Sequence, residues 1–143
     1  GGFHFNSKKY ADDDLTTGST NPYELFLIYN ELVAGEADPG RSLDVAYMID
    51  QSHNVKPKVA AMIQSVEQIQ MAYAKALLVD RVALGEAQRQ GDIIGAETIL
   101  RTAYDRDITP LLVKVREELG VPSSPLEAHL QDGYEARVAQ QRG

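Results

Sequence analysis

A histidine and a run of three aspartates lie close together near the start of the chain, in the stretch GGFHFNSKKYADDDL. Adjacent carboxylates repel one another, and holding them near a folded interior costs free energy unless a cation neutralises their charge. In an extended segment Asp12 and Asp14 face the same side, roughly 7 Å apart, so both side chains can point at one ion. Together with the imidazole of His4, this pattern predicts a divalent-metal site.

A second group of polar residues follows the apolar stretch that ends in MIDQSHN. Asp50 closes an expected strand and shares a face of that strand with Met48, because strand side chains alternate. Ser52 and His53 begin the loop that follows. Carboxylate oxygens with one imidazole are ligands that suit Mn²⁺, Mg²⁺ or Co²⁺.

Each of these signals also has a more ordinary interpretation. An aspartate run is often a solvated loop or a helix cap, and a lone histidine between phenylalanines is often a hydrogen-bonded core residue. Asp50 could cap the next helix, and a surface loop position is the preferred interpretation of His53. The metal hypothesis gains support from position, since both polar groups follow strands, and α/β barrels carry their functional groups where strands end.

The first part of the chain predicts a strand, a helix and a second strand. Residues 2–6 and 43–50 alternate as half-buried strands do. Between them, Asn21, Pro22 and Glu24 mark a helix start, and the helix is expected to end at Gly35 with Leu25, Ile28, Tyr29 and Leu32 on its apolar face. This order gives parallel strands joined by a crossover helix. Parallel sheets are covered on both faces, and a full (β/α)₈ barrel takes about 250 residues, so the fold class predicted is α/β, with residues 1–56 as part of a barrel.

The second part, residues 57–143, carries only helical patterns and is predicted to be an α-helical extension. The first helix is expected over residues 57–90, with Gly85 and Gly91 as weak points or ends. A second helix is expected to start at the cap Asp92, a third at Thr109, and a fourth at Ser124. The third helix is expected to bury four apolar side chains: Leu111, Leu112, Val115 and Leu119.

Composition limits the classes of function. The chain has 143 residues, is 43% hydrophobic and has no cysteine, so a real core is possible but a disulfide scaffold or thiolate metal site is not. The absence of cysteine fits a reducing compartment, and a cytoplasmic location is expected. A net charge of −7 disfavours nucleic acid as a partner. No apolar run is long enough for a membrane span, and the first residues lack the pattern of a signal peptide.

The stretches GGFHFNSKKYADDDLTTGS and AYMIDQSHNVKPKVAAMIQSV, with AKALLVDR and the closing GYEARVAQQRG, resemble the carboxyl-terminal part of bacterial L-rhamnose isomerases. These enzymes are related to xylose isomerases. The resemblance implies the C-terminal portion of a (β/α)₈ TIM barrel followed by a helical extension that helps to build a homo-tetramer. It also implies two divalent metal ions, commonly Mn²⁺, with Co²⁺ or Mg²⁺ as alternatives.

By position, the resemblance implies a role for five residues. His4 and Asp50 would bind the structural metal, which fixes the substrate, and Asp12 and Asp14 would bind the catalytic metal. Ser52 would lie beside the reacting carbons, so Ser52 and Asp50 are the expected catalytic residues. The family's other ligands lie on earlier strands, and the chain is therefore expected to need an N-terminal barrel half as partner.

The function expected from this resemblance is aldose–ketose isomerisation, with L-rhamnose and L-rhamnulose as the pair of sugars. The alternative is a non-catalytic helical assembly fragment that binds a partner polypeptide through the helices after Pro57. The two parallel strands favour this alternative for the isolated chain, because two such strands are not stable alone.

Overall fold

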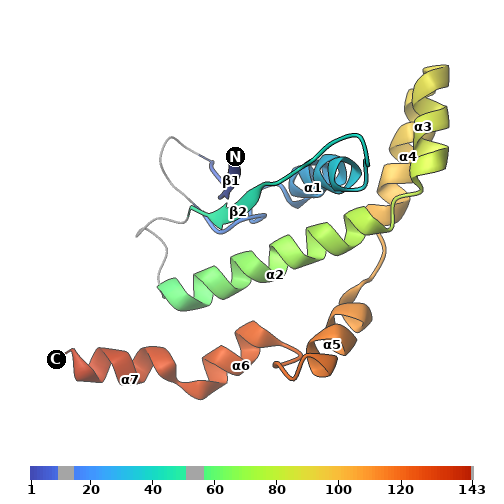
Figure 1. The fold of residues 1–143 in the computed structure, drawn as a ribbon. Coiled ribbons are helices and arrows are strands. Elements are labelled where there is room, and N and C mark those ends of the chain that lie inside the picture. The colour runs from blue at the N-terminus through green and yellow to red at the C-terminus, as the bar shows by residue number, and fades with distance from the viewer. Residues whose placement is uncertain (10–14, 51–56, 143) are drawn as a thin grey trace.

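The computed structural model describes residues 1–9, 15–50 and 57–142 (Figure 1). The elements in chain order are β1 (Gly2–Phe5), α1 (Pro22–Glu36), β2 (Ala46–Ile49), α2 (Lys58–Leu77), α3 (Arg81–Gln90), α4 (Ile93–Tyr104), α5 (Thr109–Glu118), α6 (Pro125–Asp132) and α7 (Tyr134–Gln141). The predicted order of strand, helix and strand followed by helices alone is confirmed. Across the described residues the sheet has two strands, so a barrel is not seen.

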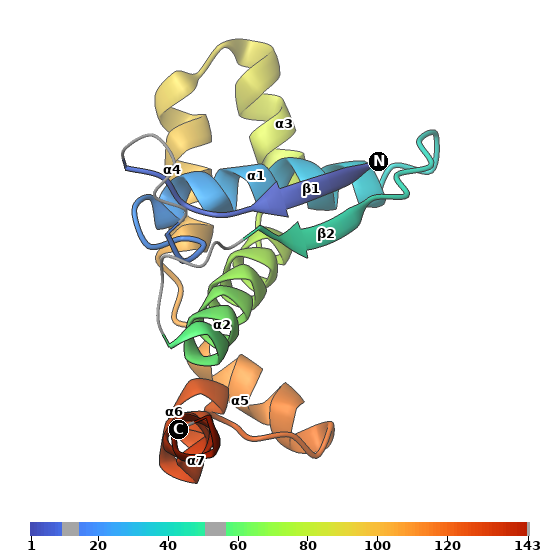
Figure 2. The same cartoon turned by 90° about the vertical axis from the view of Figure 1, so that its left-hand side faces the viewer.

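The two strands are parallel, as predicted, and Figure 2 shows their arrows pointing the same way beside α1. His4 pairs with Met48 and Phe5 with Ile49. Both strands are shorter than the sequence predicts, because a four-residue β1 offers partners to only four residues of β2. Side chains on the two strands therefore alternate between a face toward α1 and a face away from it.

Helix α1 begins where the sequence predicts. The side chain of Asn21 accepts a hydrogen bond from the backbone N–H of Glu24 at 3.1 Å, and Pro22 occupies the first turn. The helix does not stop at Gly35 but continues to Glu36. Ile28, expected on the apolar face, is 38% exposed, and the buried residues are Leu25, Phe26, Tyr29, Asn30, Leu32 and Val33.

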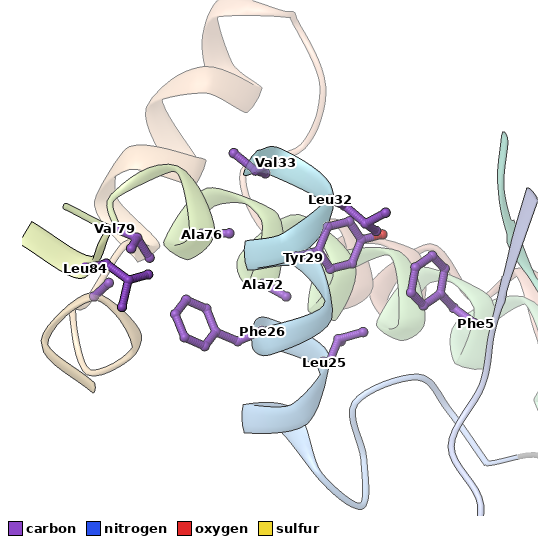
Figure 3. Packing of buried hydrophobic residues seen from close by; sticks show 11 residues of the cluster. Phe5, Leu25, Phe26, Tyr29, Leu32, Val33, Ala72, Ala76, Val79 and Leu84 are labelled. Atoms are coloured by element: carbon purple, nitrogen blue, oxygen red, sulfur yellow. The ribbon is translucent and has the colours of Figure 1, made fainter. Parts of the chain in front are cut away.

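The core lies where α1 crosses α2 (Figure 3). Helix α2 turns small residues toward α1, including Ser65, Ala72 and Ala76, so the two backbones approach closely. Phe26 and Tyr29 fill the space on the α1 side, and both are fully buried. The ring of Tyr29 stacks on Phe5 with centroids 5.2 Å apart, which attaches the sheet to the same core.

The long helix predicted over residues 57–90 is wrong, because the chain turns between α2 and α3. Asp80 caps α3 by accepting a hydrogen bond from the N–H of Ala83 at 3.0 Å. The guanidinium of Arg81 donates to Asn30 Oδ1 on α1 at 3.1 Å, which holds the turn against the core. Gly85 lies inside α3, and Gly91 ends that helix with φ of 69°.

The last three helices differ most from the sequence-based expectation. Asp92 caps α4 as predicted, but the fourth predicted helix is two helices, divided at Gly133, where φ is 67°. Ser124 makes no capping hydrogen bond through its side chain.

Figure 1 shows α5, α6 and α7 forming an arm beside α2, with α6 in contact with it. No residue of α5 is buried, so the predicted burial of its apolar side chains is wrong; Leu111 is 47% exposed, Val115 42% and Leu119 72%.

Within the described ranges, none of the helices has both the length and the apolar character that a membrane-crossing segment requires.

Candidate functional site

His4 and Asp50 lie together at the carboxyl ends of the two parallel strands. The register places His4 opposite Met48, so Asp50, two residues further on, has its side chain on the same face of the sheet. The Nδ1 atom of His4 is 3.6 Å from Oδ2 of Asp50. The backbone N–H of Asp50 donates to the carbonyl of Phe5 at 3.1 Å, which extends the ladder to this position. The structure therefore brings together two of the predicted metal ligands.

The opposite face of the sheet is occupied by the core. Phe5 and Tyr47 point toward α1 and contact the ring of Tyr29, with centroid distances of 5.2 and 5.8 Å. On the His4 face, by contrast, the side chains of His4 and Asp50 are 58% and 66% exposed to solvent when only the described residues are considered. Parallel sheets are normally covered on both faces, so the face that carries the pair is the one left for further chain or ligand.

The pair has a geometry that suits shared coordination of a cation. Imidazole nitrogen and carboxylate oxygen each lie about 2.0–2.2 Å from a divalent ion, so two ligands of one ion are roughly 3–4 Å apart. The observed 3.6 Å falls in this range. No cluster of three or more histidine, cysteine, aspartate or glutamate side chains suited to a metal occurs in the part of the chain that is described. Among the described residues, His4 and Asp50 are therefore a pair of candidate ligands.

The other predicted site residues fall outside the described residues. These are Asp12, Asp14 and Ser52, together with His53. Their assignment to a metal or a substrate stays a prediction.

A groove of about 420 Å³ lies between β1 and the first half of α1. Its lining includes His4, Lys8 and Asn21, and also Glu24, whose carboxylate accepts a hydrogen bond from the Asn21 amide at 3.1 Å. The volume lies within the range of small-molecule sites. The sequence pattern predicts only a helix-capping role for Glu24, and it gives Lys8 no role in the site. The strand–helix–strand order is the signal that could have placed all four residues together.

The fold and the site define an α/β unit with two parallel strands, a crossover helix, a helical array and a histidine–carboxylate pair at the strand ends. No protein-family model matches the chain. Over 142 residues the chain is 46% identical to a protein of Rhizobium meliloti named as a probable sugar isomerase, and 45% identical to one of Mesorhizobium japonicum with the same description. Each alignment covers 99% of this chain and 33% of the relative. The chain therefore spans about one third of the length of these relatives, and its similarity to them supports a relationship with sugar isomerases.

Proposed function

We propose that the chain is part of a metal-dependent aldose–ketose isomerase that interconverts L-rhamnose and L-rhamnulose. The proposal rests on the similarity to probable sugar isomerases along the whole chain. The position of His4 and Asp50 at the ends of two parallel strands is consistent with it. In the (β/α)₈ barrel that we propose for the full-length protein, the groups that do chemistry lie at the carboxyl ends of the strands.

The proposed metal site has two ions, Mn²⁺ or else Co²⁺ or Mg²⁺. His4 and Asp50 would hold the ion that fixes the sugar, while Asp12 and Asp14 would hold the second ion. When bound, divalent cations supply positive charge that retains sugar oxygens and polarises a carbonyl group.

The chain's own residues would orient the sugar for transfer of hydrogen between C1 and C2. His4 presents a ring nitrogen and Asp50 a carboxylate on the same face of the sheet. The proposed metal site would therefore lie on that face. The groove beside β1 offers room for a monosaccharide, with Lys8, Asn21 and Glu24 as polar groups for its hydroxyls. Ser52 would place its hydroxyl near the reacting carbons.

Two described ligands are too few to replace the water shell of a divalent ion. We infer that a glutamate, an aspartate and a histidine come from the part of a full-length protein that corresponds to the rest of the relatives, an N-terminal barrel half. The full-length protein is proposed to be a cytoplasmic homo-tetramer.

The test is turnover of L-rhamnose to L-rhamnulose by the full-length protein with Mn²⁺, compared with a panel of other aldoses. Asp50→Ala and Asp12→Ala are expected to lower kcat/KM at least about 100-fold and to lower the bound manganese measured by mass spectrometry. Asp44→Ala changes an exposed aspartate before β2 and should match the unaltered protein. Full activity and full metal content in both site variants would show that the ligand assignment is wrong.

A second candidate function is a non-catalytic assembly module. The observation that favours it is the exposed apolar surface of the helices after Pro57, where Val66 is 41% exposed, Leu77 57% and Leu119 72%. Light scattering on the isolated chain distinguishes the two ideas. A clean monomer that binds little apolar dye would contradict the assembly function.

A further inference from the structure

The carboxylate of Glu36 links α1 to β2 and to α2 through two hydrogen bonds. Glu36, in the last turn of α1, accepts a hydrogen bond from the hydroxyl of Tyr47 on β2 at 2.5 Å. Its other oxygen accepts from the hydroxyl of Tyr73 on α2 at 3.2 Å. The position of β2 is therefore tied to both core helices by side chains that lie far apart in the sequence.

Aromatic packing holds the ring of Tyr47 in the same place. Its centroid lies 6.0 Å from that of Phe5 and 5.8 Å from that of Tyr29, and Tyr29 in turn meets Tyr73 edge-on at 5.9 Å. Burial, together with the Glu36 carboxylate, raises the pKa of Tyr47 to about 12 and also raises the pKa of Tyr73. Both phenols thus stay neutral near pH 7 and keep the protons that they donate to Glu36.

Backbone hydrogen bonds alone do not hold β2 firmly in one register against β1. Each strand has four residues, and a short two-stranded sheet is marginal without packing on one face. A slip of one residue would turn Tyr47 away from Glu36 and move Asp50 off the His4 face. A slip of two residues would keep the faces but carry the Tyr47 hydroxyl roughly 7 Å from its acceptor. Only the observed register satisfies both Tyr47 and the His4–Asp50 pair.

We propose that Glu36, Tyr47 and Tyr73 form a register lock that holds Asp50 beside His4 on one face of the sheet. These three are positioning residues, since they lie on the far side of the sheet from the pair and act through β2. The inference rests on the proposed function, because it assigns the lock to the metal site that His4 and Asp50 would share.

The experiment measures the dissociation constant for Mn²⁺ alone, by electron paramagnetic resonance titration of the full-length protein. Tyr47→Phe removes the 2.5 Å hydrogen bond but keeps the ring, and is expected to weaken Mn²⁺ binding about tenfold. Glu36→Ala, which leaves both phenols without their acceptor, should weaken it at least as much. Glu36→Gln retains an oxygen that accepts from one phenol and an amide that donates to the other, so it should recover part of the loss.

The matched control is Tyr23→Phe. The Tyr23 hydroxyl donates to Glu97 at 3.2 Å, so this change removes the same kind of hydrogen bond between α1 and α4, away from β2. Tyr23→Phe is expected to lower the melting temperature about as much as Tyr47→Phe while leaving the Mn²⁺ dissociation constant unchanged. If Tyr23→Phe and Tyr47→Phe weakened Mn²⁺ binding equally, the effect would come from a general loss of stability, and the proposal would be overturned.

His4→Ala separates failure of the lock from failure of the site. If His4→Ala weakens Mn²⁺ binding and Tyr47→Phe does not, the ligand assignment stands and the register lock is wrong. If His4→Ala binds Mn²⁺ as the unaltered protein does, the metal site itself is wrong, and the lock fails with it. Weakening by His4→Ala and Tyr47→Phe, with none by Tyr23→Phe, is the result that supports the proposal.

Discussion

The hydroxyl oxygen of Ser65 accepts a hydrogen bond from the backbone N–H of Thr17 at a distance of 3.1 Å, and both residues are almost fully buried. Ser65 lies in the middle of α2, whereas Thr17 belongs to the segment between β1 and α1. The next residue, Gly18, has φ of 78° and directs the chain toward the start of α1. One buried bond therefore fixes where the chain returns to the core after β1.

Ser65→Ala should destabilise the protein by about 1–3 kcal/mol, because it leaves the buried N–H of Thr17 without this acceptor. Urea unfolding followed by circular dichroism measures the change. Ser19→Ala alters an exposed serine of the same segment and should change the free energy of unfolding by less than about 0.5 kcal/mol. A Ser65→Ala variant as stable as the Ser19→Ala variant would contradict the importance of the bond.

Thr17→Val tests the side chain of the residue whose backbone N–H is bonded to Ser65. The Thr17 hydroxyl is buried and has no hydrogen-bond partner among the described residues, while its backbone N–H is satisfied by Ser65. Valine has nearly the same shape and removes only the unsatisfied hydroxyl, so the variant should be as stable as the unaltered protein or up to about 1 kcal/mol more stable. A loss of more than 1 kcal/mol in the same urea experiment would indicate that the hydroxyl has a partner.

The core of α1 predicts a contrast between two phenylalanines. Phe26 on α1 is fully buried in the core, where its ring centroid lies 5.5 Å from that of Tyr104, whereas Phe3 on β1 is 40% exposed. Phe26→Ala should lower the free energy of unfolding by about 3–5 kcal/mol, and Phe3→Ala by clearly less, since less surface is lost from the core. Melting curves of the two variants measure these losses. Equal losses of stability would show that Phe26 is not part of the core.

Local signals predicted much of the first half of the fold. The cap at Asn21 and the period of two in the strands are properties of neighbouring residues, so the sequence alone locates α1 and the parallel pair. The shared face of His4 and Asp50 follows from the same alternation together with the strand order. The sequence thus predicts the placement of these two side chains at the strand ends, while their role in a metal site stays a prediction.

Long-range contacts explain what the sequence did not reveal. The turn between α2 and α3 contains neither glycine nor proline and depends on Arg81 reaching Asn30 on another helix. The acceptor role of Glu36 toward Tyr47 and Tyr73 likewise joins residues 11 and 37 positions away along the chain. On α5, an apolar pattern predicted burial, but a pattern does not say whether a covering element is present.

Gly85 inside α3 and Gly91 directly after it should respond oppositely to alanine. Gly85 lies inside the helix, and an added Cβ would meet only the flexible guanidinium of Arg89 at 3.4 Å, so Gly85→Ala should stabilise the protein by about 0.5–1 kcal/mol. Gly91 ends the helix with φ of 69°, and Gly91→Ala should destabilise it by about 1 kcal/mol through strain alone. Melting temperatures measure both changes, and stabilisation by Gly91→Ala would contradict the position of this helix end.

The Tyr47–Glu36 bond also predicts how stability depends on pH. An unfolded tyrosine titrates near pH 10, and in the folded chain burial and the Glu36 carboxylate raise the pKa of Tyr47 to about 12. The folded state holds this proton more tightly, so the contribution of Tyr47 to stability is complete below pH 10 and is lost as the pH rises from 10 to 12.

Absorbance at 295 nm should therefore show a late ionisation step above pH 10. Tyr29 and Tyr73 contribute to the same step, because burial raises their pKa values too, so Tyr47→Phe should lower its amplitude. The same substitution should flatten the decline of unfolding free energy between pH 10 and 12, because phenylalanine has no proton to lose. Tyr134→Phe, which removes the hydroxyl of a partly exposed tyrosine on α7, serves as the control for the loss of a phenol group. A Tyr47→Phe variant with an unchanged late step would show that Tyr47 ionises like an exposed phenol, and that Glu36 does not hold its proton.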